Sequence, residues 1–264
     1  MFEVIFHFFE GAAMQTLSLV YLGIIGLVLG SFYNVVGLRI PLNQSIISPR
    51  SSCPSCKRTL SFVELIPIFS FVVQRGKCSQ CRTRISFLYP FIEFVTAFLF
   101  VASPIIVGWT VELVFCYTLI SLLVIVTVSD LVYMLIPDKV LLFFCIPFLL
   151  LQIFTNDISW LDAIAGAIIG FTILLLMAVV TGGGIGGGDI KLFALLGFGL
   201  GVKLILLTLF FSIVYGAIVG MLLMLARKVK RRQAIPFGPF IALGAITSYY
   251  FGKEIVYWYF GVLV

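Results

Sequence analysis

The feature that most constrains this chain is a succession of apolar stretches, each long enough to cross a lipid bilayer. A membrane span needs about 20 predominantly apolar residues, and such stretches follow one another from Leu17 onward. Hydrophobic residues make up 62% of the 264 residues, and charged residues only 11%. A soluble domain of this length cannot bury that much apolar surface, and a disordered chain would be polar. The sequence therefore predicts an all-α polytopic membrane protein.

We predict about eight transmembrane helices. The sixth is short: glycines at positions 197, 199 and 201 interrupt it, and Lys203 marks its end. The predicted spans are residues 17–37, 87–107, 112–129, 139–155, 162–181, 190–202, 204–226 and 238–260. Residues 1–16 contain Glu3 and Glu10 but no Lys or Arg. Because a signal peptide begins with a basic region, a cleaved signal peptide is not expected.

The distribution of positive charge predicts how these spans are oriented. Residues 38–86, between the first and second spans, carry eight Lys or Arg residues and a single acid, Glu64. By the positive-inside rule this segment is cytoplasmic. Threading eight spans from there places 15 of the 17 Lys and Arg residues inside, leaving Lys203 and Lys253 outside. The same threading places both termini outside and divides the chain into a first helix (17–37), a cytoplasmic domain (38–86) and a membrane domain (87–264).

Four of the six cysteines form two Cys-x-x-Cys pairs in the cytoplasmic segment. Cys53 and Cys56 are separated from Cys78 and Cys81 by 21 residues. Two such pairs, each on a tight turn, provide the tetrahedral four-sulfur cage that zinc prefers. Four free thiols or two disulfides are the alternatives, and the reducing cytoplasm argues against disulfides. Zinc ribbons also bind nucleic acid, but membrane topology and anionic lipid head groups already account for the basic charge, so no nucleic-acid partner is expected.

Two aspartates are the candidate catalytic residues. Asp130 ends the third predicted span and Asp189 begins the sixth, so the threading places both at the cytoplasmic boundary. An ionised side chain at the bilayer centre costs about 2.5–3.5 kcal/mol, so acids beside spans tend to be functional. Two neighbouring carboxylates cannot both ionise cheaply, and one keeps a proton while the other acts as a base. The base activates a water and the acid protonates the scissile amide, without a covalent nucleophile or a catalytic metal.

A glycine-rich segment, residues 182–188, leads into Asp189. Its glycines permit positive φ angles and close approach to a substrate strand, whereas a plain hinge between helices is the alternative. The Gly-Lys-Ser/Thr of a phosphate-binding loop is absent. We therefore predict that Gly186, Gly188 and Lys191 support Asp189.

Two further acids are predicted to have supporting roles. Glu93 lies inside a predicted span and is expected either to pair with an arginine or to support the site. Asp138 follows Pro137 at the start of a predicted helix. Because aspartate is a favoured N-cap residue, a capping role is predicted for Asp138.

Short motifs occur along nearly the whole chain in a specific order: residues 30–36 and 39–41, 52–56, 64–67, 76–81, 89–93, 130 with 136–138, 186–191 and 236–239. Each motif alone is a weak signal. Together they resemble the prepilin peptidases, also called type IV leader peptidases, which are membrane aspartic proteases with a Gly-x-Gly-Asp motif.

The resemblance implies an enzyme that removes the short basic leader from type IV prepilins or pseudopilins, just after a glycine at the cytoplasmic membrane face. Asp130 and Asp189 correspond to the catalytic pair, and the four cysteines correspond to zinc ligands. Many relatives with the cysteine domain also methylate the new N-terminal residue, using S-adenosyl-L-methionine, so this activity is expected here. The implied location is the cytoplasmic membrane of a bacterium, and the implied substrates serve pilus assembly, secretion or competence.

Two other classes of protein are alternatives. A transporter could use membrane aspartates for proton coupling, but such transporters usually show paired halves, and the glycine run has no second copy. A zinc-ribbon scaffold that recruits a partner to the membrane would leave Asp130 and Asp189 unexplained.

Overall fold

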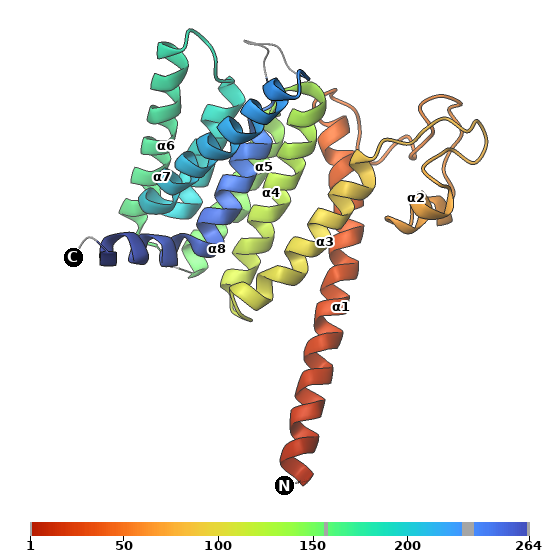
Figure 1. The fold of residues 1–264 in the computed structure, drawn as a ribbon, viewed down its shortest axis with the longest axis horizontal. Helices are drawn as coiled ribbons and strands as arrows, with labels where there is room; N and C mark the ends of the chain where they lie inside the picture. The colour runs from red at the N-terminus through yellow and green to blue at the C-terminus, as the bar shows by residue number, and fades with distance from the viewer. Residues whose placement is uncertain (1, 156–157, 229–234, 263–264) are drawn as a thin grey trace. The chain divides into compact units, whose positions relative to one another are not determined.

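The computed structural model describes residues 2–155, 158–228 and 235–262. Three basic residues used in predicting the orientation, Lys230, Arg231 and Arg232, lie outside the described residues. The described residues are helical apart from loops and two isolated β-bridges, so the all-α prediction is confirmed (Figure 1). The elements are α1 (Phe2–Arg39), η1 (Val63–Leu65), α2 (Phe69–Val73), α3 (Leu88–Ile106), α4 (Glu112–Tyr133), α5 (Asp138–Thr155), α6 (Trp160–Val180), α7 (Gly187–Leu225) and α8 (Gly238–Val262).

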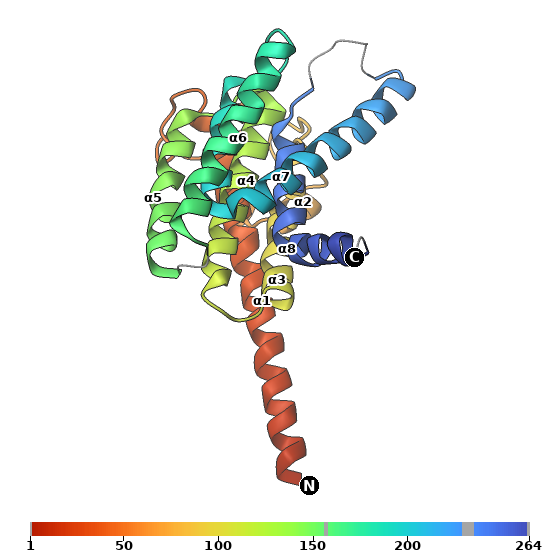
Figure 2. The ribbon, with the colours of Figure 1, turned by 90° about the vertical axis from the view of Figure 1, so that its left-hand side faces the viewer.

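Six helices in the described part of the chain, α1 and α3 to α7, are long and apolar enough to cross a membrane. Helix α7 covers both the sixth and the seventh predicted spans. It is interrupted at Gly201, where φ is 75° and ψ is 177°, a conformation that glycine adopts far more readily than other residues. Figure 2 shows that the two halves of α7 run in different directions. Helix α8 forms where the eighth span is predicted but is not among the six, so a count of eight spans stays a prediction.

The chain divides into two compact units: unit 1 is Met1–Arg39 with Ser45–Trp109, and unit 2 is Ile40–Gln44 with Thr110–Val264. In unit 1, α1 packs along α3 (Figure 1). Glycines at one helical turn's spacing allow this approach: a Cβ on Gly26 would lie 2.6 Å from the Cα of Ala97, and one on Gly30 would lie 2.9 Å from the Cα of Glu93. Small residues at this spacing are typical of helices that pack closely in membranes.

Helix α4 provides much of the core of unit 2, and it packs against α5 and α8. Its side chains Leu122, Leu123, Val126 and Val128 are fully buried. The helix continues to Tyr133, past residue 129, the approximate end of the third predicted span. Asp130 therefore lies in the last turn of the helix, which agrees with its predicted place at the end of a span.

Candidate active site and metal centre

The four predicted metal ligands meet at one point of unit 1. Their Sγ atoms all lie within 4.8 Å of one another. The Cys53 and Cys81 sulfurs are 3.6 Å apart, and those of Cys56 and Cys78 are 4.0 Å apart, distances at which the thiols are free rather than joined in disulfides. Sulfurs about 2.3 Å from a tetrahedral zinc ion would be about 3.8 Å apart. The donor set and its spacing therefore fit Zn²⁺.

Each cysteine pair lies on the same kind of backbone turn. In both, the N–H of the first cysteine donates to the carbonyl five residues later, and its carbonyl accepts from the N–H four residues later, at 2.9–3.0 Å. The residue after each pair, Lys57 in one turn and Arg82 in the other, has a φ of 59°. This left-handed conformation is uncommon for residues other than glycine. Two matching turns thus hold the four sulfurs around a common centre.

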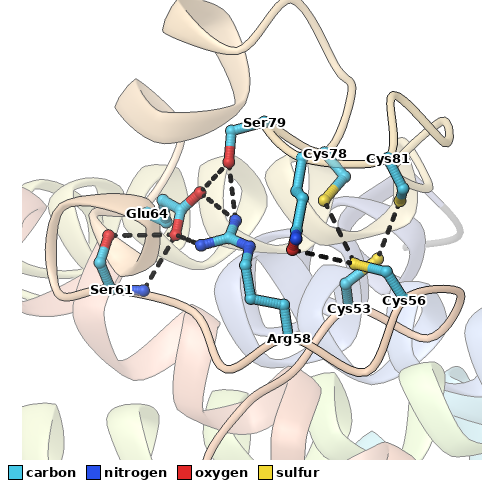
Figure 3. A network of polar contacts seen from close by, with 9 residues as sticks. Cys53, Cys56, Arg58, Ser61, Glu64, Cys78, Ser79 and Cys81 are labelled. Atoms are coloured by element: carbon cyan, nitrogen blue, oxygen red, sulfur yellow. Dashed lines mark hydrogen bonds and ion pairs between the residues drawn. The ribbon is translucent and has the colours of Figure 1, made fainter.

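Glu64 joins the two turns through a dense set of hydrogen bonds (Figure 3). Its carboxylate accepts two bonds from the Arg58 guanidinium, at 2.9 and 2.6 Å, and one from the Ser79 hydroxyl at 2.7 Å. It also accepts from the N–H and the hydroxyl of Ser61, at 2.9 and 3.0 Å. The Arg58 guanidinium, followed by the Ser61 N–H and the Ser79 hydroxyl, holds the pKa of Glu64 well below its usual range. Glu64 belongs to one of the ordered motifs, at residues 64–67, but no role was predicted for it, although it is the single acid of residues 38–86.

The thiols of the cluster differ in acidity. Backbone N–H groups of Cys81 and Gln80 lower the pKa of Cys78 to about 6. The Arg58 N–H acts in the same direction on Cys56, but burial and the neighbouring cysteines outweigh it and raise the pKa of Cys56 to about 11. Because a metal ion binds thiolates, loading the cluster at neutral pH releases protons.

Asp130 is held at the end of α4 by the first residue of α8. Its side chain is 6% exposed, and Oδ2 accepts a hydrogen bond of 2.6 Å from the backbone N–H of Gly238. A Cβ on Gly238 would lie 2.9 Å from this oxygen, so the contact requires glycine. The N-terminus of α8 is the positive end of its helix dipole and favours a nearby carboxylate. Sequence reasoning noted residues 236–239 as a motif but missed this contact.

Asp189 lies in the first turn of α7 and is 8% exposed. Its Oδ2 accepts a 3.2 Å hydrogen bond from the N–H of Gly186, the N-cap residue of the helix. Its other oxygen, Oδ1, is buried and has no hydrogen-bond partner among the described residues. The carboxylate is also near enough to interact electrostatically with that of Asp130. Asp189 therefore combines burial, a neighbouring acid and one unused acceptor.

Close backbone contacts bring the two aspartates to the same end of unit 2. A Cβ on Gly188 would lie 2.7 Å from the Cβ of Ile136, so the start of α7 presses against the link that follows α4. In the glycine run, Gly182 and Gly183 have φ angles of 64° and 90° and open space around them. The prediction that these glycines permit positive φ is confirmed at both residues.

Asp138 and Lys191 form an ion pair beside the two aspartates. The Lys191 ammonium donates to both carboxylate oxygens of Asp138, at 2.8 and 2.7 Å, and both side chains are more than half exposed. The predicted N-cap role of Asp138 is wrong: Asp138 is already the first residue of α5, and the carbonyl of Pro137 accepts from the N–H groups of Val140 and Leu141.

Glu93 serves unit 1 locally. It is 7% exposed, and its Oε2 accepts a 2.8 Å hydrogen bond from the backbone N–H of Ile68. One turn along the α1–α3 contact, the Asn34 amide donates to the carbonyl of Tyr89 at 3.2 Å. One partner of Glu93 is thus a backbone amide of the cysteine segment. Among the described residues Glu93 has no arginine partner, which was one of its two predicted roles. The other role, support of the site, stays a prediction.

These features define a class of protein: a polytopic helical membrane protein with a buried aspartate pair in unit 2 and, in unit 1, a cluster of four cysteines that could bind a metal ion. Residues 24–107 match the family model described as Bacterial Peptidase A24 N-terminal domain. Residues 117–221 match the model of the Type IV leader peptidase family. The chain belongs to the type IV leader peptidase family.

Curated relatives support this membership along both units. The Prepilin leader peptidase/N-methyltransferase of Bacillus subtilis (strain 168) is 50% identical over 237 residues, which cover 89% of this chain and 95% of the relative. Proteins of the same name from Myxococcus xanthus (strain DK1622) and Aeromonas hydrophila are 38% and 33% identical. The match to the Myxococcus protein covers 78% of this chain and 63% of that protein. The match to the Aeromonas protein covers 92% of this chain and 93% of that protein. No solved structure matches the chain.

Proposed function

We propose that this protein is a leader peptidase for type IV prepilins or pseudopilins and also methylates the N-terminus that cleavage creates. Family membership supports this activity and does not favour a proton-coupled transporter. The observation that carries the proposal is the buried pair Asp130 and Asp189, with Asp189 Oδ1 unpartnered among the described residues.

The geometry suggests how the pair cleaves a peptide bond. One carboxylate keeps a proton because two close carboxylates do not both ionise cheaply. The ionised carboxylate takes a proton from a water, whose oxygen attacks the scissile carbonyl. The protonated carboxyl then donates its proton to the leaving nitrogen. The Gly238 N–H orients Asp130, and the open backbone at Gly182 and Gly183 leaves room for a substrate strand.

We propose that Cys53, Cys56, Cys78 and Cys81 hold a structural zinc ion. A metal bound by four thiolates supplies folding energy to a small segment. The methyl donor in this proposal is S-adenosyl-L-methionine, which supplies an electrophilic methyl group to the new α-amino group. The N-methyltransferase in the names of the relatives supports this second activity.

The proposed location is the cytoplasmic membrane of a bacterium, with the cysteine segment and both aspartates on the cytoplasmic side. The positions of the Lys and Arg residues along the sequence support this orientation. A basic leader stays in the cytoplasm by the same rule, so its cleavage site would meet the aspartates at that face. The proposed substrates are pilins or pseudopilins of pilus assembly, secretion or competence.

The proposal is tested with purified Asp130→Asn and Asp189→Asn enzymes and a prepilin substrate in lipid nanodiscs. Mass spectrometry of the product reads cleavage and methylation in one measurement. Both variants should fail to cleave. Glu112→Gln is the matched control, because it removes an acid from the opposite end of α4 and should leave cleavage intact. Normal processing by either aspartate variant would exclude the proposed catalytic pair.

A separate experiment addresses the cysteine segment. The double variant Cys53→Ser, Cys56→Ser should lose its bound zinc, measured by metal analysis, and yield a correctly cleaved but unmethylated product. This outcome would assign methylation to unit 1 and cleavage to unit 2. A fully methylated product would reject that assignment.

A further inference from the structure

A groove of about 580 Å³ opens between α5 and α7 in unit 2. This volume is within the range of ligand-binding clefts, about 300–1,000 Å³. The groove can be reached from the surface, since Leu142 and Leu149 on its wall are 68% and 45% exposed. The α5 wall consists of Asp138, Leu141, Leu142, Cys145 and Leu149. The α7 wall consists of Lys191, Ala194, Leu195 and Phe198.

The charged end of the groove lies next to the candidate active site on both walls. On α7, Lys191 is two residues from Asp189. On the other wall, Asp138 is two residues from Ile136, the residue against which Gly188 packs. A chain that leaves the two aspartates therefore meets the groove within a few residues.

Polarity changes once along the groove. The Asp138–Lys191 ion pair forms one end, and all other residues of the walls are apolar. The α5 wall extends over 12 residues, from Asp138 to Leu149, or about 16 Å of helix at 1.5 Å per step. This is about half of the 30 Å hydrocarbon core of a bilayer. The groove thus suits a segment that is polar at the aspartates and apolar for the next three turns of helix.

We propose that this groove binds the apolar helix of the substrate and thereby sets the scissile bond at Asp130 and Asp189. The inference rests on the proposed function, because a leader peptidase of this kind cuts where a basic leader gives way to an apolar membrane segment. An apolar helix that moves from lipid into the groove gains little from the hydrophobic effect, because lipid tails are equally apolar. Selectivity for the substrate helix would therefore come from close packing against the walls of the groove. A lipid acyl chain would match the apolar walls but not the charged end beside the aspartates.

Filling the groove tests the proposal. Ala194→Trp places a large side chain on its α7 wall, and Ile168→Trp, at a 60% exposed position on α6, is the matched control. Each enzyme is assayed on a full prepilin and on a short peptide that spans the cleavage site but lacks the apolar helix. Ala194→Trp should raise the KM for the prepilin, relative to the KM for the peptide, by about tenfold or more, equivalent to about 1.4 kcal/mol. The ratio should be unchanged in Ile168→Trp.

A ratio unchanged by Ala194→Trp would overturn the inference while leaving the peptidase assignment intact. Failure of the wild-type enzyme to cleave either substrate would instead refute the proposed function. The two failures are therefore distinguishable.

Photo-crosslinking provides a second measurement that does not depend on turnover. A prepilin with a benzophenone side chain in the second turn of its apolar helix is bound to the Asp189→Asn enzyme in nanodiscs and irradiated. Peptide mapping should place the adducts on α5 and α7 residues of the groove, and Ala194→Trp should reduce them. Adducts confined to lipid or to α6 would overturn the inference.

Discussion

Glu64 in unit 1 and Asp189 in unit 2 are both largely shielded carboxylates, yet their surroundings are opposite. Glu64 accepts hydrogen bonds from Arg58, Ser61 and Ser79 and uses both of its oxygens. Asp189 accepts one backbone hydrogen bond, lies near a second acid, and leaves one buried oxygen unpartnered among the described residues. The first arrangement stabilises a loop, and the second leaves an acceptor available to a water or substrate.

The difference follows from what each region can bury. The cysteine segment contains few apolar side chains that are buried, so metal ligation and polar cross-links must hold it. The helices of unit 2 have a large core around α4, which tolerates an unsatisfied group costing about 1–3 kcal/mol. Departures from full polar satisfaction are expected at functional sites. The contrast thus indicates a structural role for the Glu64 carboxylate and supports the proposed catalytic role for that of Asp189.

The largest predicted effect is on catalysis at Asp189. Asp189→Asn keeps the shape of the side chain and its oxygen facing Gly186, but removes the acid–base chemistry. Cleavage should fall by about 10²–10⁴-fold, while the thermal unfolding midpoint in nanodiscs stays the same or rises, because the repulsion from Asp130 is removed. The rate is measured on a prepilin and the midpoint by intrinsic fluorescence. A variant that unfolds at a much lower temperature would contradict the contrast, because Asp189 would then be structural.

The next effect concerns the glycines that position Asp189. Gly188→Ala introduces a Cβ 2.7 Å from that of Ile136, whereas a Cβ on Gly187 meets nothing within 4 Å. Overpacking of this kind costs about 1–3 kcal/mol, so Gly188→Ala should lower both the unfolding midpoint and kcat. Gly187→Ala is the matched control and should be neutral or slightly stabilising, since alanine favours a helix over glycine by up to about 1 kcal/mol. Equal effects of the two substitutions would show that the contact with Ile136 does not position the site.

Much of this architecture could be predicted from local sequence. Apolar stretches locate the helices because lipid requires every backbone group to bond within its own segment. The interruption of α7 at Gly201 falls at the predicted end of the sixth span for the same local reason, a cluster of glycines. The cysteine spacing likewise indicates a four-sulfur cluster, and the four sulfurs do converge.

Contacts between distant residues could not be predicted in this way. The hydrogen bond from Gly238 to Asp130 joins residues 108 positions apart. Asp138 suits an N-cap by its local sequence, but its carboxylate binds Lys191, 53 positions away. Such pairs depend on how the helices pack, and no helical or turn periodicity encodes them.

A smaller effect is expected from the structural carboxylate. Glu64→Gln keeps the size of the side chain but removes the charge that binds Arg58. Removing a partner next to metal ligands typically lowers metal affinity by about 10–100-fold, so zinc competition with a chelator should show a loss of this size. Ser61→Ala, which removes only one of the bonds to Glu64, is the milder control. Cleavage of a prepilin should be affected far less than in Asp189→Asn, and an equal loss of cleavage would erase the distinction between the two carboxylates.

The smallest effect is expected where water can replace the partner. The Asp138–Lys191 pair has short contacts, but its side chains are 59% and 54% exposed. A double-mutant cycle with Asp138→Asn and Lys191→Met should give a coupling energy of about 0.2–1 kcal/mol for unfolding, the range of exposed ion pairs. This coupling should shrink as salt is added, because salt screens exposed charges. A coupling of several kcal/mol, insensitive to salt, would mean that the pair is shielded from water in the membrane, and Asp138 would then belong with Glu64 among the carboxylates that hold the structure together.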